Sequence, residues 1–215
     1  MSKLHISGPP GMTEIDPSTL TRDQRYKLLT GLVVPRPIAW VSTLSLGGKV
    51  NLAPFSAFTF VSQEPPMVLV SFGRTAGVLR QTGENILRSG EFVVNIADQS
   101  LLGFLHDSSA NYPPEESEAD ALELATAQSS VVAPPRVASA PAALECRLHL
   151  AIPFGREQNY SMIGEVLRYH VRPDLLVNDK ISTRKLDPVG RIAGPTYAQL
   201  GEMMTLPPAM VRQVD

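Results

Sequence analysis

The chain has 215 residues, of which 43% are hydrophobic and 19% charged, and its formal net charge is −2. A length and hydrophobic fraction of this kind allow one β-rich domain with a buried core, and they exclude a disordered chain. The charge lacks the basic surplus of a nucleic-acid-binding surface, and no apolar run of about 18 residues predicts a membrane-spanning helix.

Residues 1–15 have the Gly and Pro content of a flexible N-terminal arm, and residues 16–215 are expected to form a single domain. The N-terminus shows no apolar export signal. Cys146 is the one cysteine, so an internal disulfide is excluded and a reducing, cytoplasmic location is expected. The apolar alternation of Leu144, Cys146 and Leu148 favours a buried Cys146 over a reactive thiol.

A helical stretch is predicted to open at Asp16-Pro17-Ser18. Thr21 and Gln24 have the spacing of a capping box, and Gly31 is a plausible stop for this helix. Pro35-Arg36-Pro37 then forces an extended segment, because both prolines fix φ.

The remaining pattern is dominated by short strands with turns between them. The predicted strands are 38–43, 55–62, 67–72, 92–96, 143–152 and 160–171. A turn is expected at 46–49, and helical spacing at 78–88 and 101–106. Residues 107–141 read as an irregular excursion that carries one short helix around 120–127. Many short strands and few helices predict a mainly β fold, a barrel with peripheral helices.

The common catalytic motifs are missing from the chain. It has no phosphate loop, no Gly-x-Gly-x-x-Gly, no nucleophile elbow and no His-Glu-x-x-His helix. The four histidines, His5, His106, His149 and His170, have no metal-ligand spacing. We therefore assign no catalytic residue and no metal site, and expect a bound organic cofactor to supply the chemistry.

The most informative motifs lie in residues 35–96 and continue in order to residue 201. They are Arg36-Pro37-Ile38-Ala39-x-Val41-Ser42-Thr43, Asn51-x-Ala53-Pro54-Phe55-Ser56, Pro65-Pro66, Asn85-Ile86-x-x-Ser89-Gly90-Glu91-Phe92-Val93-Val94-Asn95, Tyr112-Pro113-Pro114, Leu144-Glu145-Cys146-Arg147-Leu148, Gly164-Glu165-Val166 and Arg191-Ile192-x-Gly194-x-x-Tyr197. In this ordered set, over roughly residues 30–201, the chain resembles the flavin reductase-like family. The resemblance implies an FMN-binding split β-barrel.

The resemblance also implies which residues line the isoalloxazine ring and ribityl chain. They are Ser42, Thr43, Asn51, Ala53, Pro54, Phe55 and Ser56, and Phe72 joins the same cofactor-binding set. Main-chain groups at strand ends can satisfy the edge of a flavin ring without charged side chains. The alternative is that these are ordinary strand and turn residues.

For the phosphate, Arg80-Gln81-Thr82-Gly83-Glu84-Asn85 resembles the family's Lys-Asp-Thr-x-x-Asn element. Carried over by position, Arg80 neutralises the phosphate, and Thr82 and Asn85 donate to its oxygens. Arginine replaces the usual lysine, and it can bind phosphate bidentately. Arg74 and Thr75 are a second candidate pair, and a solvated helix charge is the alternative role of Arg80.

By the same resemblance, Arg191 and Tyr197 lie near the flavin. Ala193 departs from the family pattern, in which a glycine is common at this position. A structural role of Tyr197 at a subunit boundary is the alternative.

The resemblance implies an NAD(P)H-dependent flavin reductase, with NADH or NADPH delivering hydride to flavin N5. Reduced flavin then diffuses away or reacts in place, and a monooxygenase is a possible acceptor. The alternatives are an FMN-binding electron carrier or another non-reductase split-barrel protein, and a non-catalytic interaction domain. A homodimer is expected, because proteins of this kind usually build the flavin cleft where two barrels meet.

Overall fold

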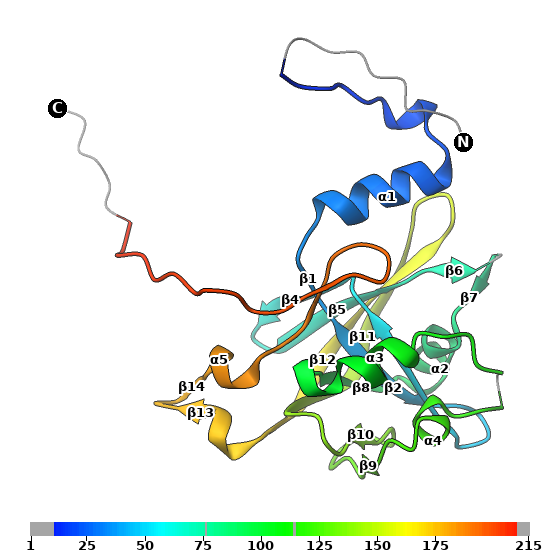
Figure 1. Ribbon diagram of the computed structural model, residues 1–215. Coiled ribbons are helices and arrows are strands. Elements are labelled where there is room, and N and C mark those ends of the chain that lie inside the picture. Colours follow the sequence, from blue (N-terminus) through cyan, green and yellow to red (C-terminus); the bar gives the residue numbers. More distant parts are fainter. Residues whose placement is uncertain (1–10, 76, 114, 210–215) are drawn as a thin grey trace.

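A seven-stranded antiparallel sheet, in the order β3-β2-β8-β11-β12-β5-β4, forms the centre of the protein (Figure 1). The computed structural model describes residues 11–75, 77–113 and 115–209. The seven strands are β2 (Ala39–Leu44), β3 (Val50–Phe55), β4 (Phe58–Gln63), β5 (Pro66–Phe72), β8 (Glu91–Ile96), β11 (Ala142–Phe154) and β12 (Asn159–Val171).

The sheet curls so that its two sides meet. Phe55 of β3, at one edge, packs edge-to-face on Phe72 of β5, near the other edge, with ring centroids 4.6 Å apart. The predicted mainly β fold, a split barrel with peripheral helices, is therefore confirmed.

Short strand pairs and helices surround the barrel. The pairs are β6 (Arg74–Thr75) with β7 (Val78–Leu79), β9 (Thr126–Ala127) with β10 (Arg136–Val137), and β13 (Leu176–Val177) with β14 (Lys180–Ile181), and a three-stranded sheet joins β1 (Arg36–Pro37), β15 (Gly190–Arg191) and β16 (Tyr197–Ala198). The helices are α1 (Arg22–Leu32), α2 (Gln81–Ser89), α3 (Leu102–Asp107), α4 (Glu118–Ala121) and α5 (Thr183–Leu186), with 3₁₀ turns at Pro17–Thr19, Gln99–Leu101 and Pro173–Leu175. No helix among the described residues combines the length and apolar character needed to cross a membrane.

The strands near the site are buried on both faces. Val41 belongs to the core inside the barrel, which α2 completes with Ile86. Its neighbour Trp40 belongs to a second core on the outer face, where Leu105 of α3 and Ala119 of α4 pack. Because successive side chains of a strand point to opposite faces, the two cores share β2 between them.

Several element boundaries differ from the prediction, for local reasons. The predicted helix at 78–88 starts at Gln81 instead, because Val78 and Leu79 pair with β6 and Arg80 is extended (φ −63°, ψ 145°). The predicted strand 55–62 is two strands, which break after Phe55.

The two remaining corrections concern helix ends. The predicted helix at 120–127 is α4, which begins after the cap Ser117 and ends before Glu123, a residue with φ 52°. Gly31 does not stop α1, which runs to Leu32. Arg36 satisfies the end of this helix by donating to the carbonyls of Thr30 and Val33.

The Thr21–Gln24 capping box of α1 and the burial of Cys146 are both confirmed. Burial, helped by the charge of Glu145, raises the pKa of the Cys146 thiol well above its ordinary value. Of the predicted N-terminal arm, residues 1–10 lie outside the described residues, and residues 11–15 form neither a helix nor a named strand.

Candidate functional site

A buried network of polar side chains joins α2 to β2 and β3. Thr82 Oγ1 donates to Asn51 Oδ1 at 2.7 Å, and Asn85 Nδ2 donates to Thr43 Oγ1 at 3.0 Å. Thr43 Oγ1 in turn donates to Asn51 Oδ1 at 3.3 Å. All four residues are buried, each with at most 5% of its surface exposed. The network therefore fixes the N-terminal half of α2 against the ends of both strands.

Glu118 of α4 completes this network from the other side. Its Oε1 accepts from Asn51 Nδ2 and its Oε2 from the backbone N–H of Leu52, both at 2.8 Å. Burial raises the pKa of Glu118, although the hydrogen bonds from Leu52 and Asn51 oppose that rise. The carboxyl thus covers part of the free edge of β3.

Pro54 lies two residues beyond Leu52 on this edge strand. Because the backbone alternates, the nitrogen of Pro54 points away from β2 on the same side as the N–H of Leu52. A proline there breaks no ladder bond, since it has no N–H to donate. The sequence Asn-x-Ala-Pro therefore suits an edge whose outer side is left for another group.

Ser42 faces away from the network. Its Oγ donates to the carbonyl of Pro135 at 2.5 Å and accepts from Asn95 Nδ2 at 3.2 Å. Strand alternation places its neighbour Thr43 on the barrel side instead. Ser42 thus anchors the 107–141 excursion, and only Thr43 of this pair joins Asn51.

The remaining predicted ring residues divide by face. Ala53, Phe55 and Phe72 pack in the barrel interior, with Phe72 fully buried. Pro54 and Ser56 are half-buried on the outer side. Ala53 is also only partly buried but packs against the interior core, so Pro54 and Ser56 are the two of the five on the outer side.

Arg36 connects this surface to the C-terminal segment. Its Nε donates to Ser56 Oγ at 3.3 Å and its Nη2 to the carbonyl of Ile192 at 2.5 Å. The guanidinium therefore joins the end of β3, the end of α1 and the strand that carries Arg191.

Arg191 and Tyr197 form a cluster with His106 of α3. Arg191 donates to the Tyr197 hydroxyl, and its guanidinium lies 4.5 Å from the centroid of the Tyr197 ring. His106 Nδ1 is 3.0 Å from the same hydroxyl. Burial raises the pKa of Tyr197, and Arg191 partly offsets that rise. The phenol is therefore neutral near pH 7 and held in one orientation.

The charged phosphate candidates lie on the surface. Arg80 is exposed at the N-cap of α2, with no side-chain capping bond. Arg74 is half-buried and donates from Nε and Nη1 to the carbonyls of Gln158 and Gly77, each at 2.9 Å. The side chain of Thr75 lies outside the described part of the structure.

The structure thus brings Thr43, Asn51, Thr82 and Asn85 together, with Arg80 next to them in the chain. Arg191 and Tyr197 form a separate group that Arg36 links to Ser56. Sequence reasoning did not single out Arg36, Glu118 or His106 as members of the site. Arg36 could have been found from the sequence, because it opens the first family motif. Glu118 could not, because nothing in the sequence distinguishes it from the other acidic residues of the stretch 115–120.

A curled antiparallel barrel with this motif set is the architecture of the split-barrel flavoproteins. The chain belongs to the Flavin reductase like domain family, whose model matches residues 31–186. The recognition made from the motifs is therefore confirmed. The family supports a flavin-related oxidoreductase.

Three relatives illustrate the similarity. The uncharacterized protein YwrF of Bacillus subtilis is 39% identical over 193 residues, covering 87% of this chain and 94% of its own. The structure of nitrilotriacetate monooxygenase component B from Bacillus cereus has a TM-score of 0.89 at 39% identity, covering 92% of this chain and 100% of its own. The 2-nitrobenzoate 2-nitroreductase NbaA of Pseudomonas fluorescens has a TM-score of 0.81 at 32% identity, covering 94% and 98%.

Proposed function

We propose that this chain binds FMN and acts as an NAD(P)H-dependent flavin reductase. The observation that carries the proposal is the hydrogen bond from Thr82 to Asn51. It holds the N-terminus of α2, with the exposed cation of Arg80, against the end of the edge strand β3. A helix N-terminus and an arginine together favour a bound phosphate.

The chemistry of the available groups fits FMN along β3. The segment from Asn51 to Ser56, which is most of β3 and the residue after it, spans about 17 Å at the usual rise per residue of a strand. Arg80 stands at the Asn51 end, and Arg36, with the Arg191–Tyr197 pair, at the Ser56 end. A phosphate at the Asn51 end would contact Arg80, and a flavin ring against Pro54 and Ser56 would contact the residues at the other end.

The buried polar residues then have a positioning role. The side chains of Thr43, Asn51, Thr82 and Asn85 already bind one another. They would hold the main chain of β3 and α2 in place for the cofactor, and Phe55 and Phe72 would support β3 from inside the barrel. Direct contact of Thr82 and Asn85 with the phosphate stays a prediction.

When bound, FMN supplies the redox chemistry by accepting a hydride at N5 from NADH or NADPH. The chain's own contribution is binding and orientation. Arg80 would neutralise the phosphate, and Tyr197, held by Arg191 and His106, would cover the ring end with a neutral donor. No group of the chain is assigned as an obligatory acid or base.

The fate of the reduced flavin is proposed from the relatives. One is named as a component of a monooxygenase and another as a nitroreductase. We favour release to a separate monooxygenase, with reduction of a substrate in place as the second candidate. We also propose that residues 16–215 act as one cytoplasmic domain.

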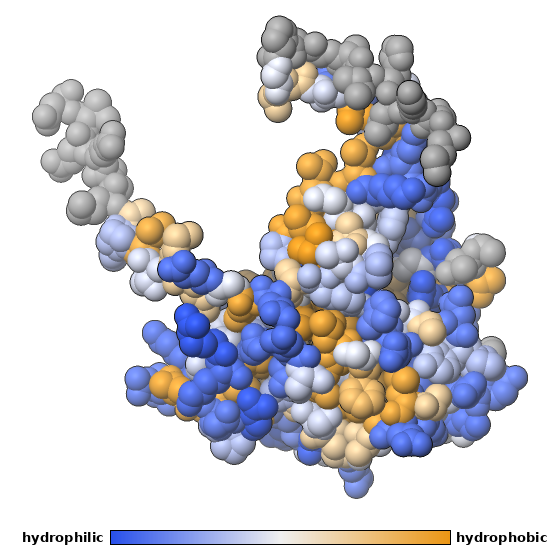
Figure 2. Space-filling view, viewed as in Figure 1, coloured by the Kyte–Doolittle hydropathy of each residue, from blue (hydrophilic) through white to orange (hydrophobic). Residues whose placement is uncertain are grey.

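A second copy of the chain would cover apolar surface that a single copy leaves exposed. Tyr26, Leu29, Leu32 and Val33 of the α1 segment are each more than half exposed, and Phe60 of β4 is 70% exposed. Figure 2 shows this apolar surface on α1 and on the body beneath it, and Figure 1 shows α1 standing away from the barrel. Burial of such surface favours association, so we propose a homodimer.

One experiment tests the flavin proposal. The purified protein should be yellow or should quench the fluorescence of added FMN, and anaerobic NADH or NADPH should then bleach the flavin absorbance. A colourless protein that quenches no FMN contradicts flavin binding. A yellow protein that neither nicotinamide reduces favours the electron-carrier alternative.

A further inference from the structure

A basic cleft opens between α1, the β6–β7 hairpin and the tip of the β11–β12 hairpin. Its volume is about 580 Å³, and it is lined by Arg22, Arg74, Gly77, Arg156, Glu157 and Gln158. Three arginines against one glutamate give it a net charge of +2, whereas the whole chain carries −2. The volume lies in the range of small-molecule sites and far exceeds what one inorganic ion needs.

Two of the three arginines are available to a ligand. Arg22 forms a two-pronged ion pair with Glu157, which uses the one carboxylate of the lining. Within the described residues, Arg74 and Arg156 have no carboxylate partner. Two guanidinium charges therefore face the cleft without compensation.

Arg74 is held in place before any ligand arrives. Its Nε and Nη1 donate to the carbonyls of Gln158 and Gly77, and its guanidinium lies 5.7 Å from the ring centroid of Tyr160. Gly77 makes this possible with φ 82°, a conformation that side chains disfavour. The remaining edge of the guanidinium is thus presented in a fixed orientation, which lowers the entropic cost of binding.

The cleft also adjoins the proposed flavin phosphate site. Arg74 is the register partner of Leu79, the residue that precedes Arg80. A ligand in the cleft would therefore lie beside the phosphate end of the flavin.

We propose that this cleft binds the pyrophosphate and adenosine half of a dinucleotide. A pyrophosphate carries two negative charges, which match the uncompensated charges of the Arg74 and Arg156 guanidinium groups, and arginine can bind phosphate oxygens through two N–H groups. The dinucleotide is the nicotinamide donor or FAD, which share this half. If the ligand is the nicotinamide donor, the inference rests on the proposed function, because that function requires a nicotinamide to reach the flavin.

The direct test is calorimetric titration of the purified holoprotein with ADP-ribose, which has the pyrophosphate and adenosine but no redox ring. Arg156→Gln replaces a side chain that has no hydrogen-bond or ion-pair partner within the described residues, so the fold is expected to stay intact. Loss of a charge-assisted contact should raise the Kd for ADP-ribose roughly 10-fold. Arg74→Lys, which keeps the charge but loses the fork, should also weaken binding.

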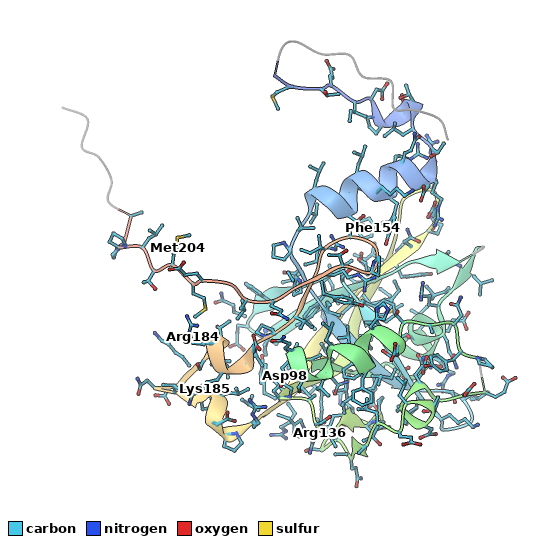
Figure 3. The ribbon with its side chains drawn as sticks, viewed as in Figure 1. Asp98, Arg136, Phe154, Arg184, Lys185 and Met204 are labelled. Atoms are coloured by element: carbon cyan, nitrogen blue, oxygen red, sulfur yellow. The ribbon has the colours of Figure 1, made fainter. Side chains whose placement is uncertain are left out.

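Arg184→Gln is the matched control. Arg184 lies on α5, on the side of the body away from β6 and β7 (Figures 1 and 3), and its removal changes the net charge equally. This variant should bind ADP-ribose like the wild type. Added salt should weaken ADP-ribose binding more in the wild type than in Arg156→Gln. Ions screen the attraction between Arg156 and the pyrophosphate, and the variant lacks that attraction.

Two kinetic and binding arms identify the dinucleotide. A raised KM for NADH or NADPH in Arg156→Gln, with unchanged turnover of reduced nicotinamide mononucleotide, assigns the cleft to the donor. A raised Kd for FAD with unchanged nicotinamide kinetics assigns it to FAD. Both results support the proposal.

Two other results would overturn it. The first is ADP-ribose binding to Arg156→Gln as tight as to the wild type. The second is a loss of FMN affinity in this variant equal to its loss of ADP-ribose affinity, which would make the cleft part of the flavin site. The proposed function fails separately, by absence of FMN binding in the wild-type protein.

Discussion

Thr82 Oγ1 lies 2.7 Å from Asn51 Oδ1, and this hydrogen bond joins the first turn of α2 to the edge strand β3. Both residues are almost fully buried. An unpaired polar group at such a position costs more than the hydrogen bond itself contributes. The pair is therefore sensitive to the loss of either partner, and it couples the stability of the barrel end to the proposed flavin site.

Thr82→Val should lower the free energy of unfolding by about 1–3 kcal/mol, since Asn51 Oδ1 keeps only the longer bond from Thr43. FMN affinity should fall with it, because the N-terminus of α2 loses its support. Urea denaturation and FMN fluorescence quenching measure the two effects. Thr59→Val on the exposed face of β4 is the control and should stay within about 0.5 kcal/mol of the wild type. Equal stability of the two variants would refute the coupling.

Arg80→Ala should weaken FMN binding by about 1.5–3 kcal/mol, the contribution of charge-assisted hydrogen bonds to a phosphate. Riboflavin, which has no phosphate, should bind wild type and variant alike. Fluorescence titrations with both flavins give this comparison, and Arg147→Ala, an exposed arginine on β11, serves as the charge control. An equal loss for FMN and riboflavin would place Arg80 outside a phosphate site.

Gly164, in the motif Gly164-Glu165-Val166, lies where the structure leaves no room for a side chain. A Cβ at this position of β12 would lie under 3.0 Å from two ring atoms of the buried Phe92 and 3.3 Å from Cβ of Cys146. Gly164→Ala should therefore destabilise the protein by about 1–3 kcal/mol through overpacking. Gly103→Ala in α3, where nothing lies within 4 Å of the new Cβ, should be neutral or slightly stabilising. Thermal unfolding of both variants decides, and a Gly164→Ala protein as stable as Gly103→Ala would count against this packing.

Glu145 makes the free energy of unfolding depend on pH in the acidic range. Its burial raises the pKa, but hydrogen bonds from the N–H groups of Ser130 and Val131 and from His170 outweigh it and hold the pKa below its ordinary value. A depressed pKa means that ionised Glu145 stabilises the fold above its unfolded pKa of about 4.3, and that this contribution is lost as the pH falls through the folded pKa.

Glu145→Gln should accordingly cost about 1–3 kcal/mol at pH 7, because the buried groups lose a charged partner. The variant should also lose less stability than the wild type when the pH is lowered below the pKa of a carboxyl group in the unfolded chain. Urea unfolding at several pH values gives both quantities, with Glu202→Gln in the exposed tail as the control. Parallel pH profiles for wild type and Glu145→Gln would contradict the assignment.

Local patterns in the sequence account for much of the fold and less of the site. The alternation of apolar residues predicts the strands, and Thr21 with Gln24 predicts the start of α1, because these signals act within a few residues. The Glu118–Leu52 bond joins residues 66 positions apart, and the Arg36–Ile192 bond joins residues 156 apart. No local pattern encodes such pairs. Thr82 and Asn85 were predicted as phosphate ligands, and their side chains bind Asn51 and Thr43, because α2 turns that face toward the barrel end.

The apolar side of α1 predicts the oligomeric state. Leu29 and Leu32 are 64% and 79% exposed, and Figure 3 shows Phe154 on the side of the body that faces this helix. If a second copy covers α1, the wild type should sediment as a dimer at micromolar concentration. Leu29→Glu with Leu32→Glu should sediment as a monomer, because charges at a closed apolar interface are costly. Lys27→Glu on the same helix adds a glutamate outside that pair of leucines and should remain dimeric. A monomeric wild type, or a leucine variant that still forms dimers, would show that this helix does not form the contact.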